Sequence, residues 1–215
     1  HILGQTDDIN DGISGIEKSF DKDLRNKKKI KTSLHLTLDS NLQYLIREEL
    51  IKAQRDFRSI GSAAVLMNVN NGEILSLISL PDYDLNQRIS LESESYTNKI
   101  TLGVYELGSV FKTFTIAAGL ENKLINPNTI FSNLENSLTC DKYTISEHDK
   151  LPKKLNTEQI LIRSSNIGAV RIAQKIGVEK YRTFLNSLDL LNVINFDLDE
   201  IGTPLPFKWG KCKLA

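Results

Sequence analysis

Hydrophobic and polar positions alternate along parts of this chain with the period of two that is typical of strands. Residues 34–38 place three leucines alternately with a histidine and a threonine, which predicts a half-buried strand. Two longer apolar runs follow at 62–69 and 73–80. Asn70-Asn71-Gly72 separates them, and because Asn-Gly is a strong signal for a tight turn, these two runs are predicted to form a β-hairpin.

Other stretches repeat their hydrophobic residues with the helical period of about 3.6 residues. Helices are predicted over residues 40–58, 109–121, 157–162, 166–176 and 178–188. The first has an apolar stripe made of Leu42, Leu45, Ile46, Leu50, Ala53 and Phe57. The last is expected to face inward with Tyr181, Phe184, Leu185 and Leu188.

Several of these predicted helices have capping residues at their ends. Either Asp39 or Ser40 can cap the first helix, and Ser40 with Gln43 three residues later matches a capping box. Thr157 is placed to cap the third helix. Gly177 is expected to close the fourth.

The rest of the chain is predicted to be largely irregular. Residues 1–31 are polar and end in a lysine-rich run at 27–31, which we interpret as the solvated face of a connecting segment. Residues 82–104 and 128–155 are loop-like, the latter with a short strand or two. Early strands and late helices together predict an α+β fold, in which helices pack on an antiparallel sheet.

Composition and charge exclude several classes of protein. The 27 basic and 27 acidic residues give a formal net charge of zero, so nothing indicates a nucleic-acid partner. Cys140 and Cys212 have no other cysteine at metal-ligand spacing and are expected to be unpaired, and no metal or cofactor is predicted. The apolar stretch 60–69 is too short to cross a bilayer. Because the chain begins with His1 rather than Met, we expect more chain before it.

Ser109 and Lys112 form a Ser-x-x-Lys sequence at the start of a predicted helix. Residues three positions apart lie on one face of a helix, so the lysine can reach the serine hydroxyl. Burial beside an apolar helix would lower the pKa of the lysine, and a neutral lysine can act as the base that activates a serine nucleophile. The backbone N–H groups at the helix start could bind an oxyanion.

Other interpretations of this sequence remain open. Ser-x-x-Lys also occurs by chance, and Ser19 with Lys22 matches it in a polar segment that no apolar helix follows. Ser109 could serve only as a helix N-cap. A Ser-His-Asp triad fits less well, because the chain has three histidines and no Gly-x-Ser-x-Gly sequence.

Ser164, Ser165 and Asn166 form the only Ser-x-Asn sequence of the chain, between two predicted helices. A turn there would direct the Ser164 hydroxyl and the Asn166 amide together into a cleft. The amide can donate to a substrate carbonyl, and the hydroxyl can pass a proton. The alternative is a turn with a helix cap and no catalytic role. Beside a Ser-x-x-Lys sequence, the catalytic interpretation is favoured.

These two sequences together resemble the signature of penicillin-binding proteins and serine β-lactamases, in which Ser-x-x-Lys and Ser-x-Asn are followed by Lys-Thr-Gly. The chain is most similar to class B penicillin-binding proteins of the cell-division (septal) transpeptidase type. The resemblance covers nearly the whole chain. It includes the pedestal junction, the first helix, the central hairpin and the approach to the nucleophile, at 1–17, 36–43, 63–81 and 98–109.

The resemblance implies how the chain is divided. Residues 1–32 would be the end of an N-terminal pedestal domain with a linker. Residues 33–215 would be the N-terminal portion of a transpeptidase domain with an incomplete penicillin-binding protein/serine β-lactamase fold. No Lys-Thr-Gly occurs before Ala215, and Leu107 stands where many relatives have proline. We therefore expect a fragment that lacks its third motif and its membrane anchor, and that is inactive by itself.

The resemblance also implies a reaction. Ser109 would attack the D-alanyl–D-alanine amide of a peptidoglycan stem peptide, with Lys112 as the candidate base. Ser164 would pass the proton to the leaving amine, and Asn166 would orient the amide. The Ser109 N–H would form half of the oxyanion hole. The substrate-binding residues that it implies are Gly108 and Ser165.

The partners and the location follow from the same resemblance. Expected partners are peptidoglycan stem peptides, lipid-linked precursor strands, β-lactam antibiotics and cell-division membrane proteins. The expected location is the periplasmic face of a bacterial inner membrane. A D,D-carboxypeptidase or a β-lactamase, which would hydrolyse the acyl-enzyme, is an open alternative. A catalytically inactive penicillin-binding scaffold or sensor, which would only bind, is another.

Overall fold

The computed structural model describes residues 1–26, 33–87, 90, 93–140 and 143–206. The chain divides into two units, His1–Val104 with Val193–Thr203 and Tyr105–Asn192 with Pro204–Ala215. Helices and antiparallel strand pairs occur together, so the fold belongs to the predicted α+β class.

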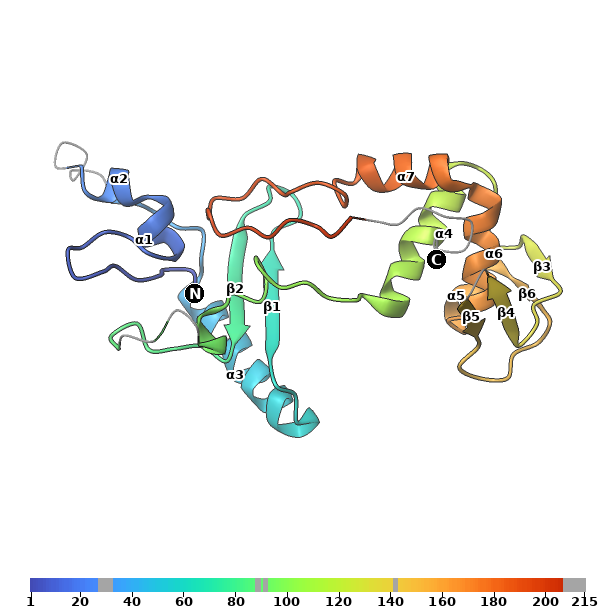
Figure 1. The fold of residues 1–215 in the computed structure, drawn as a ribbon, viewed down its shortest axis with the longest axis horizontal. Helices are drawn as coiled ribbons and strands as arrows, with labels where there is room; N and C mark the ends of the chain where they lie inside the picture. The colour runs from blue at the N-terminus through green and yellow to red at the C-terminus, as the bar shows by residue number, and fades with distance from the viewer. Residues whose placement is uncertain (27–32, 88–89, 91–92, 141–142, 207–215) are drawn as a thin grey trace. The chain divides into compact units, whose positions relative to one another are not determined.

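The first unit contains the predicted β-hairpin. β1 (Ser62–Met67) and β2 (Ile74–Leu80) pair antiparallel, and helix α3 (Ser40–Phe57) runs alongside them (Figure 1). In the connecting turn Gly72 has φ +79°, a conformation that costs glycine little, and its N–H donates to the Asn68 carbonyl at 2.8 Å. The prediction made from the Asn-Gly sequence is confirmed.

Helix α3 is capped by Asp39, so the predicted capping box of Ser40 with Gln43 is wrong. The Asp39 carboxylate accepts from the N–H groups of Asn41 and Leu42 at 2.8 and 3.0 Å. It thereby satisfies two of the N–H groups that have no partner at a helix start.

The Gln43 side chain is used for a contact with β2 instead. Its Nε2 donates to the Leu77 carbonyl at 2.8 Å, and its Oε1 accepts from the Leu77 N–H at 3.0 Å and from the Ser76 hydroxyl at 2.8 Å. The side-chain amide therefore pairs with Leu77 as a neighbouring peptide group would. Both backbone polar groups of a strand residue are satisfied in this way, which a capping box would not achieve.

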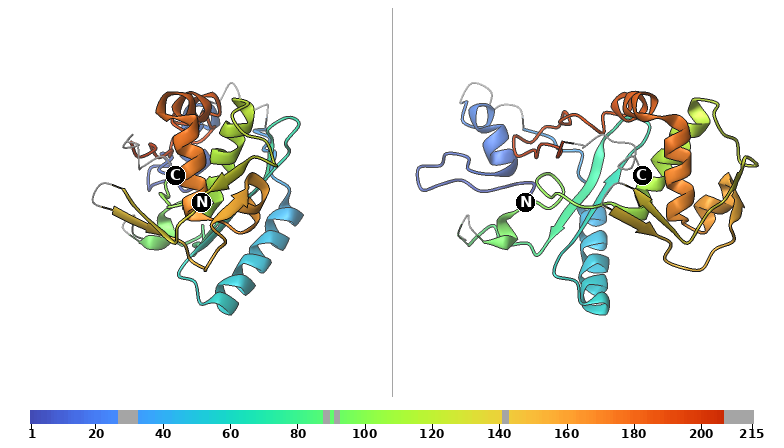
Figure 2. Two further views of the ribbon diagram at one scale, coloured as in Figure 1. Left: turned by 90° about the vertical axis from the view of Figure 1, so that its right-hand side faces the viewer. Right: turned by 45° about the vertical axis from the view of Figure 1, so that its right-hand side comes forward.

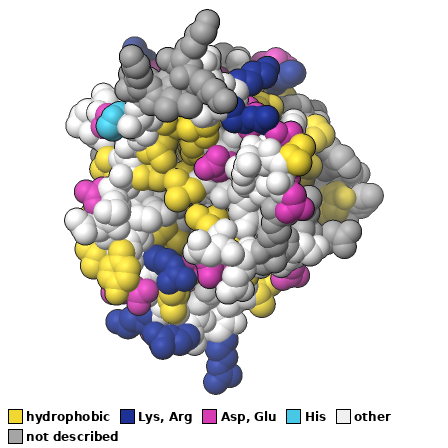
Figure 3. Space-filling view, turned by 90° about the vertical axis from the view of Figure 1, so that its left-hand side faces the viewer, with side chains coloured by type: hydrophobic (Ala, Val, Ile, Leu, Met, Phe, Trp, Pro, Cys, Tyr) yellow, Lys and Arg dark blue, Asp and Glu magenta, His cyan; other side chains and the backbone are white. Residues whose placement is uncertain are grey.

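Residues 34–38 do not form the predicted half-buried strand. Leu34 and Leu36 are 42% and 37% exposed, and this segment bends at Thr37 and has no strand partner among the described residues. Its end meets β2 through the Asp39 N–H, which donates to the Leu75 carbonyl at 2.9 Å. Figure 3 shows one face of the molecule, on which hydrophobic side chains lie together near the middle.

Short elements complete the first unit. They are α1 (Gly15–Ser19), α2 (Asp21–Leu24) and the 3₁₀ helix η1 (Glu94–Tyr96). Ser19 of the second Ser-x-x-Lys sequence ends α1, and its hydroxyl accepts from the Asp199 N–H at 2.9 Å. This serine therefore has a structural partner.

The second unit is a cluster of helices. α4 (Lys112–Glu121), α6 (Asn166–Ile176) and α7 (Val178–Ser187) pack against one another, and α5 (Thr157–Ile162) precedes α6 (Figures 1 and 2). Gly177 ends α6 with φ +80°, as predicted. The buried core is made of Ile116, Ala118, Ile125, Leu134, Leu155, Ile160, Ile167, Ile172, Ala173, Ile176, Tyr181 and Leu185.

Residues 128–155 contain more strands than predicted. β3 (Ile130–Ser132) pairs with β6 (Lys154–Asn156), and β4 (Ser137–Cys140) pairs with β5 (Tyr143–Ser146), both antiparallel. Strands of three or four residues are too short to show an alternating pattern. Their pairing depends on partners that are distant in sequence or joined by a short connection.

Some predictions about the helices are wrong in detail. Asn156 rather than Thr157 caps α5, where it forms a capping box. Leu188, predicted to face inward, lies just beyond α7 and is 46% exposed. Leu45 and Phe57 of the predicted stripe on α3 are 58% and 82% exposed. Periodicity identifies one face of a helix but not how far a neighbouring element covers it.

A few predictions concern residues outside the described part of the chain. They are the lysine run at 27–31, the boundary after residue 32, Cys212 and the side chain of Cys140. In the part that the structure describes, no helix combines the length and the apolar character needed to cross a membrane.

Candidate active site

The Ser-x-x-Lys residues lie where a short 3₁₀ helix passes into α4. The 3₁₀ helix η2 (Gly108–Phe111) contains Ser109, and α4 begins at Lys112, so the single helix predicted over 109–121 is two consecutive helices. Ser109 is exposed near the start of η2, where backbone N–H groups lack partners within the helix. Gly108 has φ +56°, a conformation that favours glycine.

The Ser-x-Asn residues form the predicted turn between α5 and α6. Ser164 has φ +51°, a left-handed conformation that costs a residue other than glycine about 1–3 kcal/mol. Ser165 is the N-cap of α6, and its hydroxyl accepts from the Gly168 N–H at 2.9 Å. Asn166 is the first residue of α6.

Lys112 connects the two sequences. Its ammonium donates to the carbonyl oxygen of Ser164 at 2.7 Å, to the Ser164 hydroxyl at 3.1 Å and to Oδ1 of Asn166. The Asn166 Nδ2 donates to the Ser146 carbonyl at 2.7 Å, which holds the amide with its oxygen toward the lysine. Because an amide nitrogen carries two hydrogens, Asn166 keeps a second N–H that could donate a hydrogen bond to a substrate carbonyl.

Lys112 is half-buried at this junction. Burial lowers the pKa of its ammonium below the ordinary value, while the Glu147 carboxylate acts in the opposite direction. A lower pKa increases the fraction of neutral lysine at a given pH, and only the neutral amine can accept a proton from a serine.

The contact predicted between Lys112 and the Ser109 hydroxyl is not formed. Among the described residues, the side-chain hydrogen bonds of Lys112 go to Ser164 and Asn166 instead. Positions three apart share a helix face, but a lysine side chain is long enough to reach acceptors on another segment. Hydrogen bonds of catalytic pairs commonly shorten only when substrate is bound.

Glu147 belongs to this site, although the sequence did not single it out. It follows β5 directly, and its carboxylate accepts from the Ser165 hydroxyl at 2.6 Å. It also accepts from the N–H groups of Asn166 and Ile167 at 2.8 and 3.0 Å. A carboxylate at a helix start is a favoured arrangement, but the sequence does not indicate which of 27 acidic residues folds back to it.

Ser165 has its side chain committed within the chain. It is 0% exposed, its hydroxyl donates to Glu147, and its oxygen accepts from Gly168. The side chain of Ser165 therefore has no exposed atom with which to perform the predicted substrate-binding role. At Gly108, the other predicted binding residue, no atom of the described residues beyond its chain neighbours lies within 4 Å of the position that a Cβ would take.

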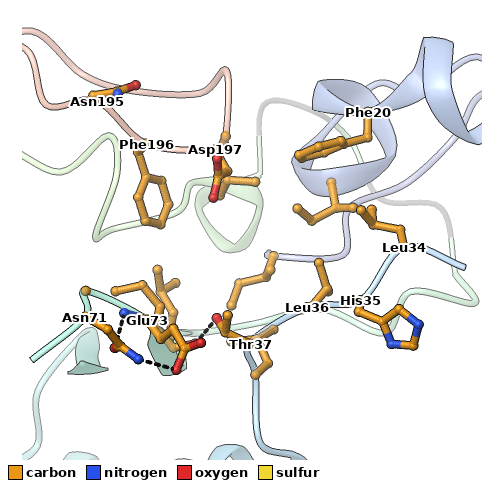
Figure 4. A pocket seen from close by; sticks show the side chains of 17 residues that line it. Phe20, Leu34, His35, Leu36, Thr37, Asn71, Glu73, Asn195, Phe196 and Asp197 are labelled. Atoms are coloured by element: carbon orange, nitrogen blue, oxygen red, sulfur yellow. Dashed lines mark hydrogen bonds between the residues drawn. The ribbon is translucent and has the colours of Figure 1, made fainter. Parts of the chain in front are cut away.

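A cavity of about 440 Å³ lies within the first unit. Phe20, Leu36 and Phe196 line it together with the polar side chains of Glu73 and Asp197 (Figure 4). The predicted catalytic residues do not contribute to it. Across the described ranges, no group of His, Cys, Asp and Glu side chains could hold a metal ion.

The penicillin binding protein transpeptidase domain matches residues 62–211, a range that contains both the Ser-x-x-Lys and the Ser-x-Asn sequence. The chain therefore belongs to the penicillin-binding protein transpeptidase family, as the two sequences predicted.

Curated relatives agree with this family. A protein of Caulobacter vibrioides named "Probable peptidoglycan D,D-transpeptidase FtsI" is 30% identical over 217 residues. The peptidoglycan D,D-transpeptidase FtsI of Buchnera aphidicola is 31% identical over 222 residues. The matches cover 100% and 92% of this chain but 37% and 38% of the relatives. The chain thus spans less than two fifths of the length of these proteins.

A solved structure shows the same fold. Penicillin binding protein 3 from Mycobacterium tuberculosis, in its apo form, matches with a TM-score of 0.82 and 21% sequence identity. The match covers 99% of this chain and 50% of that one. The same protein has also been solved in complex with ampicillin.

Proposed function

We propose that the protein containing this chain is a peptidoglycan D,D-transpeptidase, which cross-links stem peptides through a serine acyl-enzyme during septal cell-wall synthesis. The observation that carries this proposal is the set of hydrogen bonds from Lys112 to Ser164 and Asn166. These bonds bring the Ser-x-x-Lys and Ser-x-Asn residues together in one site. The names of the FtsI relatives support it. Residues 1–32 would end a pedestal domain, and residues 33–215 would begin the transpeptidase domain.

In the first step, the Ser109 hydroxyl attacks the carbonyl carbon of the D-alanyl–D-alanine amide. A C–O bond forms, the C–N bond breaks, and the terminal D-alanine leaves as a free amine. Lys112 takes the hydroxyl proton, helped by the burial that lowers its pKa. Ser164, whose hydroxyl lies 3.1 Å from the Lys112 Nζ, gives its proton to the leaving nitrogen and takes the one that Lys112 received from Ser109. The Ser109 N–H supplies one oxyanion donor.

In the second step, an amine of a neighbouring stem peptide attacks the ester. A C–N bond forms, the C–O bond to Ser109 breaks, and the proton that the attacking amine loses is returned to the Ser109 oxygen. Asn166 would orient the substrate amide through its second N–H. Gly108 would leave the backbone beside Ser109 open to the substrate. Ser165 would hold the turn rather than touch the substrate.

Further partners belong to the same proposal. β-Lactam antibiotics would acylate Ser109 in place of the stem peptide, and the ampicillin complex of penicillin binding protein 3 supports this expectation. Lipid-linked precursor strands and cell-division membrane proteins would be partners of the whole protein. The site would act in the periplasm, beside the bacterial inner membrane.

The test is acylation of the full-length protein by a labelled penicillin. We expect one covalent adduct, found on Ser109 by peptide mass spectrometry and lost in Ser109→Ala. Ser19→Ala is the matched control, because Ser19 belongs to the second Ser-x-x-Lys sequence, and it should keep the adduct. An adduct that persists in Ser109→Ala would contradict the assignment of the nucleophile.

Product analysis then separates transfer from hydrolysis. With stem-peptide substrates, a transpeptidase gives cross-linked dimers, whereas a D,D-carboxypeptidase gives the shortened monomer. A β-lactamase turns over the labelled penicillin, so its adduct decays quickly. A protein that forms no adduct at all would be a scaffold rather than an enzyme.

A further inference from the structure

We infer that Glu147 is a positioning residue of this site: it holds the turn at residues 164–166 against the end of β5, so that Ser164 and Asn166 meet Lys112. The inference rests on the proposed function, since it assigns a residue that supports acylation. Glu147 would not touch the substrate. It would act indirectly, by positioning Ser164 and Asn166.

The carboxylate is itself firmly placed. Glu147 directly follows β5, whose last residue Ser146 is paired with Ser137 of β4. The backbone N–H of Glu147 continues this pairing by donating to the Asn136 carbonyl at 3.0 Å. The side chain thus projects from the end of an antiparallel pair, not from a free loop.

The carboxylate binds three consecutive residues of the turn and of α6. The donors are the Ser165 hydroxyl and the N–H groups of Asn166 and Ile167, at 2.6, 2.8 and 3.0 Å. Charge-assisted hydrogen bonds of this kind are about twice as strong as neutral ones, and the helix start adds a favourable dipole. Ser165 and Ile167 are 0% and 1% exposed, so water competes little for these bonds.

Asn166 is held from two sides by neighbouring residues. Its backbone N–H is bound by Glu147, and its side-chain Nδ2 by the Ser146 carbonyl at 2.7 Å. Together these contacts fix which end of the amide faces Lys112. Ser164, the second residue before Asn166, has the strained φ of +51°. Such a conformation persists only where the surrounding structure enforces it. Loss of the carboxylate should therefore release the turn and misplace Ser164 and Asn166, the two residues that accept hydrogen bonds from Lys112.

Three variants of the full-length protein test this role. Glu147→Gln keeps the size but places an N–H₂ group where an acceptor is needed. Glu147→Asp keeps the charge with a shorter reach. Glu135→Gln is the matched control, because Glu135 lies in the same unit and forms an exposed ion pair with Lys153 at 2.9 Å. The readouts are the rate constant of acylation by a fluorescent penicillin, on the pH plateau, and the fraction of molecules acylated at saturation.

We expect Glu147→Gln to be acylated about 10- to 100-fold more slowly, because small misplacements of catalytic groups have effects of this size. The acylated fraction should stay at the wild-type level. Glu147→Asp should recover part of the rate, and Glu135→Gln should match the wild type. If Glu147→Gln does not fold, Ser165→Ala removes one of the three donors with a smaller change and should also slow acylation.

Several outcomes would overturn the inference. One is a Glu147→Gln variant, or in its place Ser165→Ala, that is acylated at the wild-type rate. Another is a lower acylated fraction whose molecules react at the wild-type rate, which would mean that Glu147 only stabilises the fold. A wild-type protein without any adduct at Ser109 would refute the proposed function itself, and the inference with it.

Discussion

Replacing Gly168 by alanine should destabilise the second unit, although alanine is the better helix former. A Cβ at this position of α6 would lie 2.7, 2.8 and 2.9 Å from Cγ1, Cγ2 and Cδ1 of Ile160. Carbon atoms in favourable contact are about 3.5–4.0 Å apart. Ile160 is 1% exposed, and a β-branched side chain in a helix has little freedom at χ1, so it cannot turn away.

The magnitude follows from two opposing effects. Inserting a methyl group into a packed core costs about 1–3 kcal/mol, and the rigid contact places this site in the upper half of that range. Alanine in place of glycine within a helix gains about 0.8–1 kcal/mol. The free energy of unfolding should therefore fall by about 1–2 kcal/mol in Gly168→Ala.

The assay is urea unfolding of the full-length protein, followed by a double-mutant cycle with Ile160→Ala. That variant removes all three contacting carbons and should itself cost about 2–5 kcal/mol. In its background Gly168→Ala should become neutral or stabilising, which gives a coupling of about 2 kcal/mol. A gain in stability from Gly168→Ala alone would refute the packing argument, since only helix propensity would then be acting.

Three further predictions concern burial, capping and charge. Tyr181→Phe should lower the free energy of unfolding by about 1–3 kcal/mol, because Thr115 loses its buried partner at 2.7 Å. Asp39→Ala should cost about 0.5–2 kcal/mol through loss of the α3 cap. The rate of acylation should rise with pH as Lys112 loses its proton. The Glu147 carboxylate raises the pKa of Lys112, so Glu147→Gln should move this rise to lower pH.

Control variants and contrary outcomes check these predictions. Tyr44→Phe, at an exposed tyrosine on α3, should leave thermal unfolding unchanged while Tyr181→Phe lowers the midpoint. Asp39→Asn should retain most of the cap, since asparagine is also a good N-cap residue, and equal losses in both Asp39 variants would contradict the capping role. In pH–rate profiles, a rise displaced to higher pH in Glu147→Gln would contradict the assigned influence of the carboxylate.

Local signals predicted the elements that depend on local chemistry. The Asn-Gly turn gave the hairpin, and the helical period ending at Gly177 gave α6 with its correct bounds. Alternation failed at residues 34–38, because a pattern of leucines does not reveal whether a partner strand lies beside them. The short strands expected in residues 128–155 could not be located, because a pair such as β3 with β6 joins segments that are more than twenty residues apart.

The candidate site could be predicted only in part for the same reason. Ser-x-x-Lys and Ser-x-Asn identified the residues that converge, but not the hydrogen bonds between them. Lys112 contacts Ser164 and Asn166, more than fifty residues away, rather than the nearby Ser109. The hydrogen bond from Ser165 to Glu147 can form only when the end of β5 and the start of α6 lie side by side in the folded chain.

The hydrogen bonds of Gln43 give the hairpin two unlike edges. On β2, the Gln43 amide occupies both polar groups of Leu77, and the Asp39 N–H occupies the Leu75 carbonyl, so a strand could not pair along this edge at Leu75 and Leu77. On β1, no second neighbour is present among the described residues, and Val65 and Met67 are 46% and 49% exposed. Any strand that enlarges this sheet must therefore be added along β1, which gives the sheet a single direction of growth.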